Sequence, residues 1–227
     1  MKIPLFDIDG TLFKAGDKTH ADAFKHAFKT VYGIPAVQTD IYPEGMTYSQ
    51  IIVEVLRLRG LTSAEIRRKI KATHEAMADY FKEHENETFP EILPGVVELL
   101  EKLRKQKIPI GLLTGNVEKI AWTKIERAGL KGFFDFGAFG NRSEIRSELV
   151  EIARVNAENF LKRPVNKNEL IIIGDTPKDI TCARDAGIKA IVAPTGFHSF
   201  DELAKEKPDL LVRSLEEQDK VLNFLKN

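Results

Sequence analysis

Residues 2–12 read KIPLFDIDGTL. A short, mostly apolar run stops there at two carboxylates and a glycine, which is typical of a buried strand that enters a turn. Gly10 permits a tight turn, and the Thr11 hydroxyl can bond the loop backbone. The pattern therefore predicts a strand whose end presents Asp7 and Asp9 to one cavity.

Strands and helices alternate from Pro90 onward. The apolar runs predict strands at 108–113, within 133–139, at 170–173, at 188–192 and at 210–212. Helical periodicity and stop signals predict helices at 95–106, 116–128, 144–161, 177–186 and 214–225. Because each strand is a continuous apolar run, we expect an α/β fold with a Rossmann-like parallel sheet core covered on both faces.

A second region, residues 14–89, contains helical patterns and no convincing strand. Helices are expected from about residue 21 to 31, over 48–59, and from Thr62 to about residue 85. The stripe of Phe24 and Phe28 indicates the core of this helical block. The predicted organisation is a catalytic core of residues 1–13 plus 90–227, with an inserted helical cap domain over residues 14–89.

Three predicted strands end in polar signatures: Asp7-Ile8-Asp9, Thr114-Gly115-Asn116 and Gly174-Asp175. Ligands of parallel α/β sheets bind beyond the carboxyl ends of the strands. If the three strands are neighbours, their polar ends meet in one site. Positions far apart in the chain would then act together.

The expected site suits phosphate chemistry with a hard cation. Carboxylates without a Cys or His cluster favour Mg²⁺, and a carboxylate can serve as a nucleophile. Backbone N–H groups and the Thr114 hydroxyl can bind phosphate oxygens. A basic side chain would offset charge on the transferring group. Its candidates are Arg142, Arg146 and Lys178.

On these motifs the chain resembles the haloacid dehalogenase-like superfamily, in its phosphoglycolate phosphatase-like branch. Residues 7–11 resemble the DxDGT first motif. The resemblance implies that Asp7 is the nucleophile that becomes an aspartyl-phosphate and that Asp9 is the general acid and base. It also implies Mg²⁺ bound by the Asp7 carboxylate, the Asp9 backbone carbonyl and the Asp175 carboxylate, with Asp179 as a supporting acid.

The second motif of the family resembles residues 113–116, which implies phosphate binding by Thr114, Gly115 and Asn116. The third motif places a basic residue ahead of the strand that carries the fourth. We prefer Arg146 over Arg142, because its offset to the following apolar residues resembles the motif better.

Residues 45–52 resemble a cap segment that often follows a G-x-T-D pattern, with Tyr48 in place of the Asp. Such a cap can close over the site, exclude water and meet the leaving group.

The amino-acid composition excludes few classes of protein. Lys plus Arg and Asp plus Glu both number 34, so the formal net charge is zero, and nothing favours nucleic acid or an anionic membrane. The one cysteine, Cys182, suits a reducing compartment, and no apolar stretch of ~18 residues appears. We therefore expect a cytoplasmic protein, monomeric or homodimeric. The histidines of the helical block, His20, His26, His74 and His84, are expected on the solvated surface.

The predicted function is a Mg²⁺-dependent phosphatase acting on a small phosphorylated metabolite, either phosphoglycolate-like or a sugar phosphate. A phosphomutase resembling β-phosphoglucomutase would use the same residues and pass the phosphoryl group to a sugar. A third alternative, of another class, is a catalytically idle binding or regulatory protein on the same fold.

Overall fold

The computed structural model describes residues 2–87 and 89–226, and this part of the chain contains a six-stranded parallel sheet. The strand order is β3-β2-β1-β4-β5-β6. The strands are β1 (Ile3–Phe6), β2 (Gly111–Thr114), β3 (Phe136–Phe139), β4 (Leu170–Gly174), β5 (Lys189–Val192) and β6 (Leu210–Leu211). Strand β1 lies between β2 and β4, so the three polar strand ends predicted above are neighbours.

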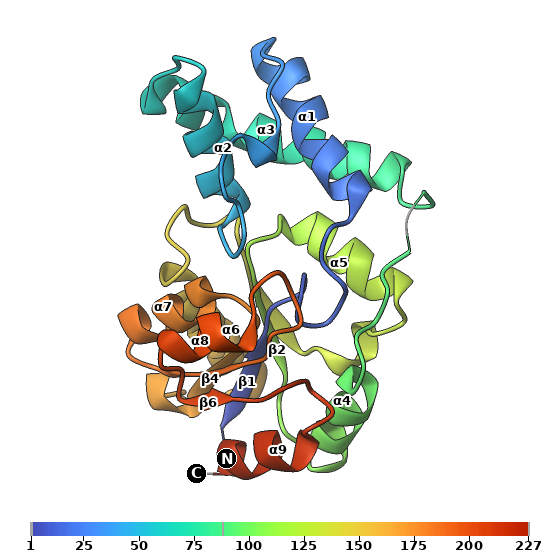
Figure 1. Ribbon diagram of the computed structural model, residues 1–227, viewed down its shortest axis with the longest axis vertical. Helices are drawn as coiled ribbons and strands as arrows, with labels where there is room; N and C mark the ends of the chain where they lie inside the picture. Colours follow the sequence, from blue (N-terminus) through green and yellow to red (C-terminus); the bar gives the residue numbers. More distant parts are fainter. Residues whose placement is uncertain (1, 88, 227) are drawn as a thin grey trace.

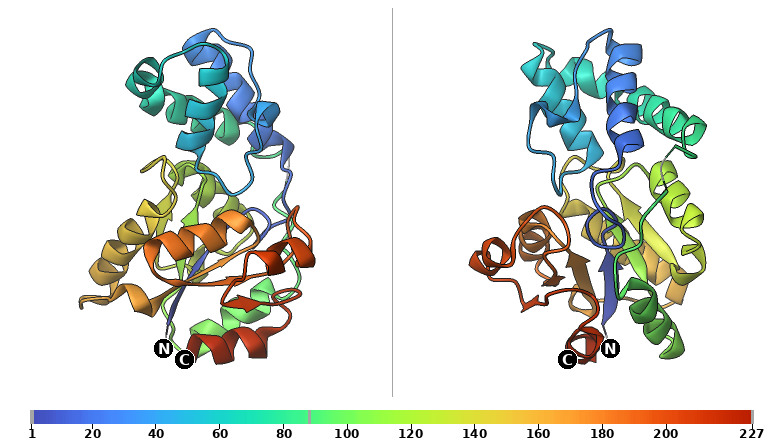
Figure 2. Two further views of the ribbon diagram at one scale, coloured as in Figure 1. Left: turned by 60° about the vertical axis from the view of Figure 1, so that its left-hand side comes forward. Right: turned by 45° about the vertical axis from the view of Figure 1, so that its right-hand side comes forward.

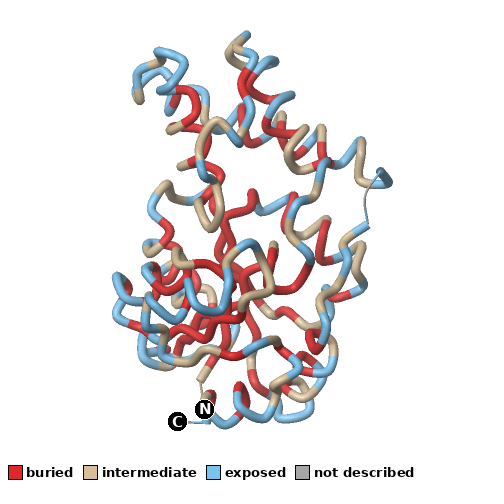
Figure 3. Tube along the Cα trace, in the orientation of Figure 1, coloured by how far each residue is buried: buried red, intermediate tan, exposed pale blue. Residues whose placement is uncertain are grey.

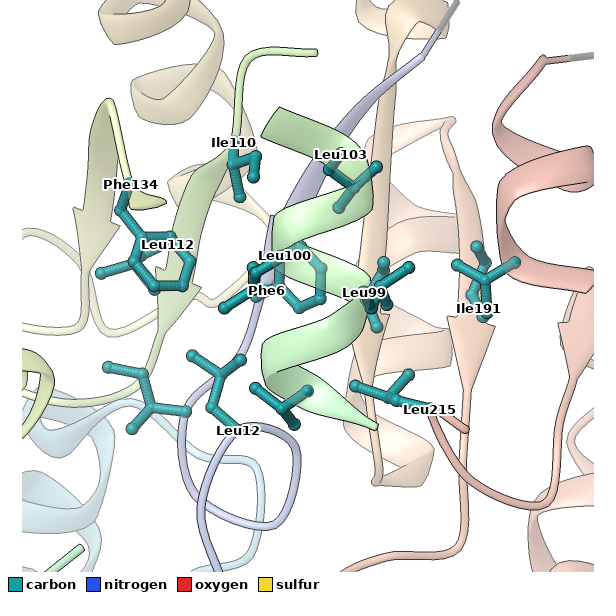
Figure 4. Packing of buried hydrophobic residues seen from close by; sticks show 14 of the residues in the cluster. Phe6, Leu12, Leu99, Leu100, Leu103, Ile110, Leu112, Phe134, Ile191 and Leu215 are labelled. Atoms are coloured by element: carbon teal, nitrogen blue, oxygen red, sulfur yellow. The ribbon is translucent and has the colours of Figure 1, made fainter. Parts of the chain in front are cut away.

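Helices cover both faces of this sheet (Figure 1). They are α4 (Val96–Lys105), α5 (Glu118–Arg127), α6 (Glu148–Leu161), α7 (Pro177–Ala186), α8 (Phe200–Lys205) and α9 (Gln218–Lys226). Alternate strand residues enter two apolar clusters: Phe6 packs with α4 and α9, whereas Leu5 packs with α6 and α7. Figure 4 shows Leu99, Leu100 and Leu103 of α4 against the face of the sheet that carries Phe6. Burial on both faces explains why the strands are continuous apolar runs.

The helical block stands over the carboxyl ends of the strands (Figures 1 and 2). It consists of α1 (Lys18–Tyr32), the short 3₁₀ helix η1 (Gln38–Asp40), α2 (Tyr48–Leu58) and α3 (Ser63–Glu83), and its described residues form no strand. Phe24 and Phe28 are buried in its own apolar cluster, as predicted. Val117 and Ile120, at the start of α5, complete that cluster and join the block to the sheet region. Buried residues accordingly occur in the sheet region, in the helical block and where the two meet (Figure 3).

The structure corrects two predicted helix starts. Helix α1 begins at Lys18, earlier than expected, because the Asp17 side chain accepts hydrogen bonds from the backbone N–H groups of Thr19 and His20. Helix α6 begins at Glu148 rather than at residue 144. Before it, the Ser143 hydroxyl accepts from the Ile145 N–H and donates to the Glu148 carboxylate, which holds a turn. Helix α8 was not predicted.

The α/β fold class with a parallel core is confirmed. None of the described helices has both the length and the apolar character that crossing a bilayer requires. Cys182 is a buried apolar-cluster residue, in keeping with a single unpaired thiol.

Candidate active site

A cavity of about 330 Å³ is lined by residues from the carboxyl edge of the sheet and from the helical block. Residues from β1, β2 and β4 and the loop before α6 meet there, although they are far apart in the chain. The predicted site residues that line it are Asp7, Asp9, Thr114, Gly115, Asn116, Arg146 and Asp175. The three polar strand ends therefore lie around one cavity, as expected.

Asp7 follows β1 directly and is buried. One carboxylate oxygen, Oδ1, accepts the Ile8 N–H at 2.7 Å, and Oδ2 accepts from Arg146 Nη2 at 2.8 Å. Burial raises the pKa of Asp7, and the Arg146 guanidinium opposes this by favouring the ionised form. The arginine thus offsets part of the effect of burial, although the pKa of Asp7 stays raised on balance.

Arg146 joins three parts of the structure. Its Nη2 also donates to Asp179 Oδ1 at 2.6 Å, and its Nη1 donates to the Gly45 carbonyl of the helical block at 3.0 Å. Its buried Nε has no hydrogen-bond partner among the described residues. Arg142 instead lines a different cleft, between α3 and α5. Of the two candidate arginines, Arg146 is the one beside Asp7.

The carboxylates of Asp7, Asp175 and Asp179 each place an oxygen within 4.8 Å of the others. Asp175 accepts from the Thr11 hydroxyl at 2.8 Å, and Asp179 accepts from the Thr176 hydroxyl at 2.7 Å. Burial, followed by the charges of Asp179 and Asp7, raises the pKa of Asp175 well above its ordinary value. A divalent cation would relieve this repulsion, and an all-oxygen donor set fits Mg²⁺.

Two glycines allow the Asp175 carboxylate to lie where it does. Gly10 has a φ of 84°, and an added Cβ would lie 2.2 Å from Asp175 Oδ2. A Cβ on Gly196 would lie 1.9 Å from the same oxygen. Both positions therefore need a residue without a side chain, which explains the glycine in the first motif beyond its turn conformation.

Asp9 has a different set of partners from Asp7. Lys124 Nζ contacts its two carboxylate oxygens at 2.8 and 3.0 Å, and Asn116 Nδ2 donates to Oδ2 at 2.8 Å. Burial alone would raise the pKa of Asp9, but the Lys124 charge, with a smaller contribution from His20 and the hydrogen bonds of Lys124 and Asn116, lowers it to about 2. Asp9 is thus held as a carboxylate.

Lys124 is a functional candidate that the sequence reasoning missed. It is only 2% exposed, in the middle of α5. It shares the buried side of that helix with Ile120, Ala121 and Ile125. A lysine in an apolar helical stripe is a signal that could have been found, because lysines are almost never fully buried unless they are paired.

The helical block touches the second motif through its α2 terminus. The Tyr48 hydroxyl donates to Asn116 Oδ1 at 2.7 Å, and the Tyr48 N–H donates to the Gly115 carbonyl at 2.8 Å. A Cβ on Gly115 would lie 2.0 Å from the Met46 carbonyl oxygen, so only glycine allows this approach. Tyr48, which stands where the family pattern has an Asp, therefore contacts Asn116 directly.

Two of the histidines contradict the prediction of a solvated surface. His20 lines the cavity and stacks on Tyr48, with ring centroids 4.8 Å apart, and His74 is buried with its ring beside the Ser49 hydroxyl. Burial lowers the pKa of each to about 4; for His20, the nearby Lys124 charge adds to this. For His20 the prediction was wrong because α1 begins early enough to place this residue in its first turn, beside Tyr48. For His74 it was wrong because this residue lies on the side of α3 that packs against Ser49 of α2.

Comparison with known proteins identifies the class to which this fold and site belong. The family model of the haloacid dehalogenase-like hydrolases matches residues 4–193. The chain therefore belongs to the haloacid dehalogenase-like hydrolases, and the predicted family is confirmed.

Individual relatives are similar over nearly their whole length. The chain is 22% identical to a phosphoglycolate phosphatase of Synechococcus elongatus, covering 94% of this chain and 93% of the relative. It is 26% identical to the pyrophosphatase PpaX of Halalkalibacterium halodurans, covering 93% and 92%. A crystal structure of a hydrolase from Pseudomonas syringae shares the fold, with a TM-score of 0.72, 20% identity and 99% of each chain covered.

Proposed function

We propose that this protein is a Mg²⁺-dependent phosphatase that hydrolyses a small phosphorylated metabolite through an aspartyl-phosphate on Asp7. The observation that carries the proposal is the convergence of Asp7, Arg146 and Asp175 at one edge of the sheet, in the cavity beneath the helical block. The phosphatases among the relatives support the same reaction class.

In this proposal, Asp7 Oδ attacks phosphorus, and the bond to the leaving oxygen breaks on the opposite side. Arg146 holds the nucleophile and offers its unpaired Nε to a phosphoryl oxygen. The Thr114 hydroxyl and the backbone of Gly115 bind further phosphoryl oxygens. Asn116 was predicted to bind phosphate as well, but its amide is already bonded to Asp9 and Thr114. We therefore assign Asn116 to the support of Asp9.

The metal site would use Asp7, the Asp9 carbonyl and Asp175, with Asp179 as the supporting acid. Asp179 fits that role, since its carboxylate is engaged by Arg146 and Thr176. When bound, Mg²⁺ would neutralise charge on the nucleophile and on the phosphoryl group.

Asp9 is proposed as the acid that protonates the leaving oxygen and then as the base that activates water. The negative charge of a bound phosphoryl group opposes the field of Lys124 and so favours the protonated form of Asp9 during the first step. The leaving alcohol and the incoming water occupy the same place, so a single carboxyl group can serve both.

Residues 14–89 are proposed as a cap domain that sets the substrate. The cap side of the cavity carries Asp17 and Glu44 and, as a cation, Lys18, which is itself paired with Asp22. The buried Nε2 of His20 has no hydrogen-bond partner among the described residues. These groups suit the hydroxyls of an uncharged leaving group better than a carboxylate or a second phosphate. We therefore favour a sugar or polyol phosphate over phosphoglycolate.

The decisive experiment replaces the nucleophile. The Asp7→Asn variant should fold normally and lose phosphate release from p-nitrophenyl phosphate by a factor of about 10⁴ or more, whereas Asp185→Asn, on the exposed side of α7, should remain active. Removal of metal with EDTA should silence the wild type, and Mg²⁺ should restore it. Near-normal activity of Asp7→Asn would overturn the mechanism, and an inactive wild type would favour an idle binding protein.

The substrate and the mutase alternative are tested together. Glycerol phosphate should be hydrolysed faster than phosphoglycolate, which has a similar size and an additional carboxylate. Free phosphate should appear from sugar phosphates, whereas isomerisation without phosphate release would identify a mutase.

A cytoplasmic location, supported by the free buried thiol of Cys182, is part of the proposal.

A further inference from the structure

All three N–H donors of the Lys124 ammonium group are used, and their acceptors belong to Asp9 and Asn116. Its Nζ lies 2.8 and 3.0 Å from the two Asp9 oxygens and 3.2 Å from Asn116 Oδ1. An ammonium group has three N–H donors. Because these three contacts use all of them, Lys124 leaves no donor for a phosphoryl oxygen and is not a substrate ligand.

The surroundings of Lys124 prevent it from exchanging partners. Its side chain is 2% exposed, and Nζ lies 5.8 Å from the centre of the Phe81 ring of helix α3. Burying an ammonium ion is costly unless it is paired. The buried ion is therefore stabilised by its pair with Asp9.

Asp9 is in turn fixed from two sides. Asn116 Nδ2 donates to Asp9 Oδ2, and Asn116 is itself held by the Thr114 and Tyr48 hydroxyls through contacts of 2.8 and 2.7 Å. The two carboxylates of the first motif thus have separate cations, Arg146 for Asp7 and Lys124 for Asp9. This division keeps the two carboxylates apart and aims them at different atoms.

We propose that Lys124 is a positioning residue that holds the Asp9 carboxyl group on the leaving-group side of the cavity. This inference rests on the proposed phosphatase function. As the Asp7–phosphorus bond forms and the phosphorus–oxygen bond of the ester breaks, the Asp9 proton passes to the leaving oxygen. Lys124 keeps its own protons throughout. Its effect should therefore be large where the leaving oxygen needs a proton and small where it does not.

The test compares leaving groups of similar size in Lys124→Met. We measure kcat/KM, which reports the steps up to phosphoryl transfer, for p-nitrophenyl phosphate and for benzyl phosphate. Nitrophenolate leaves readily without a proton, whereas benzyl alkoxide does not. In the variant, kcat/KM should fall about 100-fold for benzyl phosphate and less than about fivefold for p-nitrophenyl phosphate. The control Lys119→Met, an exposed lysine on the same helix, should change neither value.

Other outcomes decide against the proposal. An equal fall for both esters, or no fall for either, would overturn it. If Lys124→Met does not fold, Lys124→Gln, which keeps an N–H donor, replaces it with the same expected split. Loss of folding in both variants, seen by circular dichroism, would show a purely structural role and would also overturn the proposal. Failure of the phosphatase function is distinct, because the wild type would then hydrolyse neither ester.

Discussion

The Asp7 half of the site and the Asp9 half differ in what holds them. The Asp7 half consists of Asp7, Arg146, Asp175 and Asp179, which come from two strand ends, the turn before α6 and the first turn of α7. The Asp9 half consists of Asp9, Asn116, Lys124 and Tyr48, which come from the two loops after β1 and β2, the middle of α5 and the helical block. One half has three carboxylates around a cation, and the other has a single carboxylate with several donors.

This difference shows how one DxD motif can hold two aspartates in different environments. Ile8 separates two residues of the same type, and their environments then diverge. Burial and neighbouring carboxylates raise the pKa of Asp7, whereas Lys124 brings the pKa of Asp9 to about 2. The Asp7 half should therefore matter equally for every substrate, and the Asp9 half should matter according to the leaving group.

After replacement of Asp7 itself, the largest effect is expected from breaking the Asp7 half with Arg146→Met. Two buried carboxylates, Asp7 and Asp179, would lose their shared cation, which costs about 3–5 kcal/mol of folding stability. We expect kcat/KM to fall about 10³-fold for nitrophenyl and benzyl esters alike, measured at a temperature where the variant is folded. Arg142→Met, in the other cleft, is the control. A fall confined to poor leaving groups would contradict the division into halves.

Gly196→Ala should disturb the Asp7 half with a smaller loss of activity than Arg146→Met. The new methyl would overlap Asp175 Oδ2 and displace a proposed metal ligand. We expect about 100-fold lower activity at fixed Mg²⁺, with a higher half-saturating Mg²⁺ concentration in a titration. Gly132→Ala is the matched control, since an added Cβ there meets no described atom within 4 Å. An unchanged Mg²⁺ titration would argue against Asp175 as a ligand.

The Asp9 half can be tested through the pH dependence of stability in the presence of EDTA. The pKa of Asp9 lies at about 2 in the folded protein against an ordinary value of 3.8. Its ionisation therefore contributes about 2 kcal/mol of stability that is present above about pH 4 and is lost as the pH falls through about 2. Lys124→Met should lack this contribution, so its difference in unfolding free energy from wild type should shrink on acidification. A difference independent of pH would contradict the ion pair.

The smallest effect is expected from Tyr48→Phe, which removes one hydroxyl from the Asp9 half. The buried bond to Asn116 should be worth about 1 kcal/mol in urea unfolding, while Asn116 keeps its contact with Lys124. Activity on benzyl phosphate should fall by less than tenfold and more than activity on p-nitrophenyl phosphate. Tyr42→Phe, at a tyrosine that is 89% exposed, is the control. Equal behaviour of the two variants would remove Tyr48 from the Asp9 half.

The Asp7 half could be predicted from local patterns. Asp7 and Asp175 each follow a continuous apolar run, and such runs form neighbouring strands of a parallel sheet. The choice of Arg146 over Arg142 needed the family resemblance, because both arginines precede the same helix. The predicted start of that helix at residue 144 was wrong, since hydrogen bonds of the Ser143 side chain compete with the helical turn.

The Asp9 half could not be predicted in the same way. The apolar stripe around Lys124 marks it as a buried lysine, but the sequence does not show that its partner is Asp9. His20 was expected in solvent, because its ring is covered by Tyr48, which lies on another helix. Side-chain partners that are distant in the chain leave no periodic signal.

Local patterns are enough to predict the parallel sheet, the helices of residues 14–89 and the three strand ends that carry Asp7, Thr114 and Asp175. The reason is that continuous apolar strands and glycine-containing turns are local properties of the chain. The pairing of each cation with its carboxylate depends on long-range packing, because Arg146 and Lys124 reach Asp7 and Asp9 from elements far apart in sequence. Those two ion pairs give the two aspartates of the DxD motif different environments.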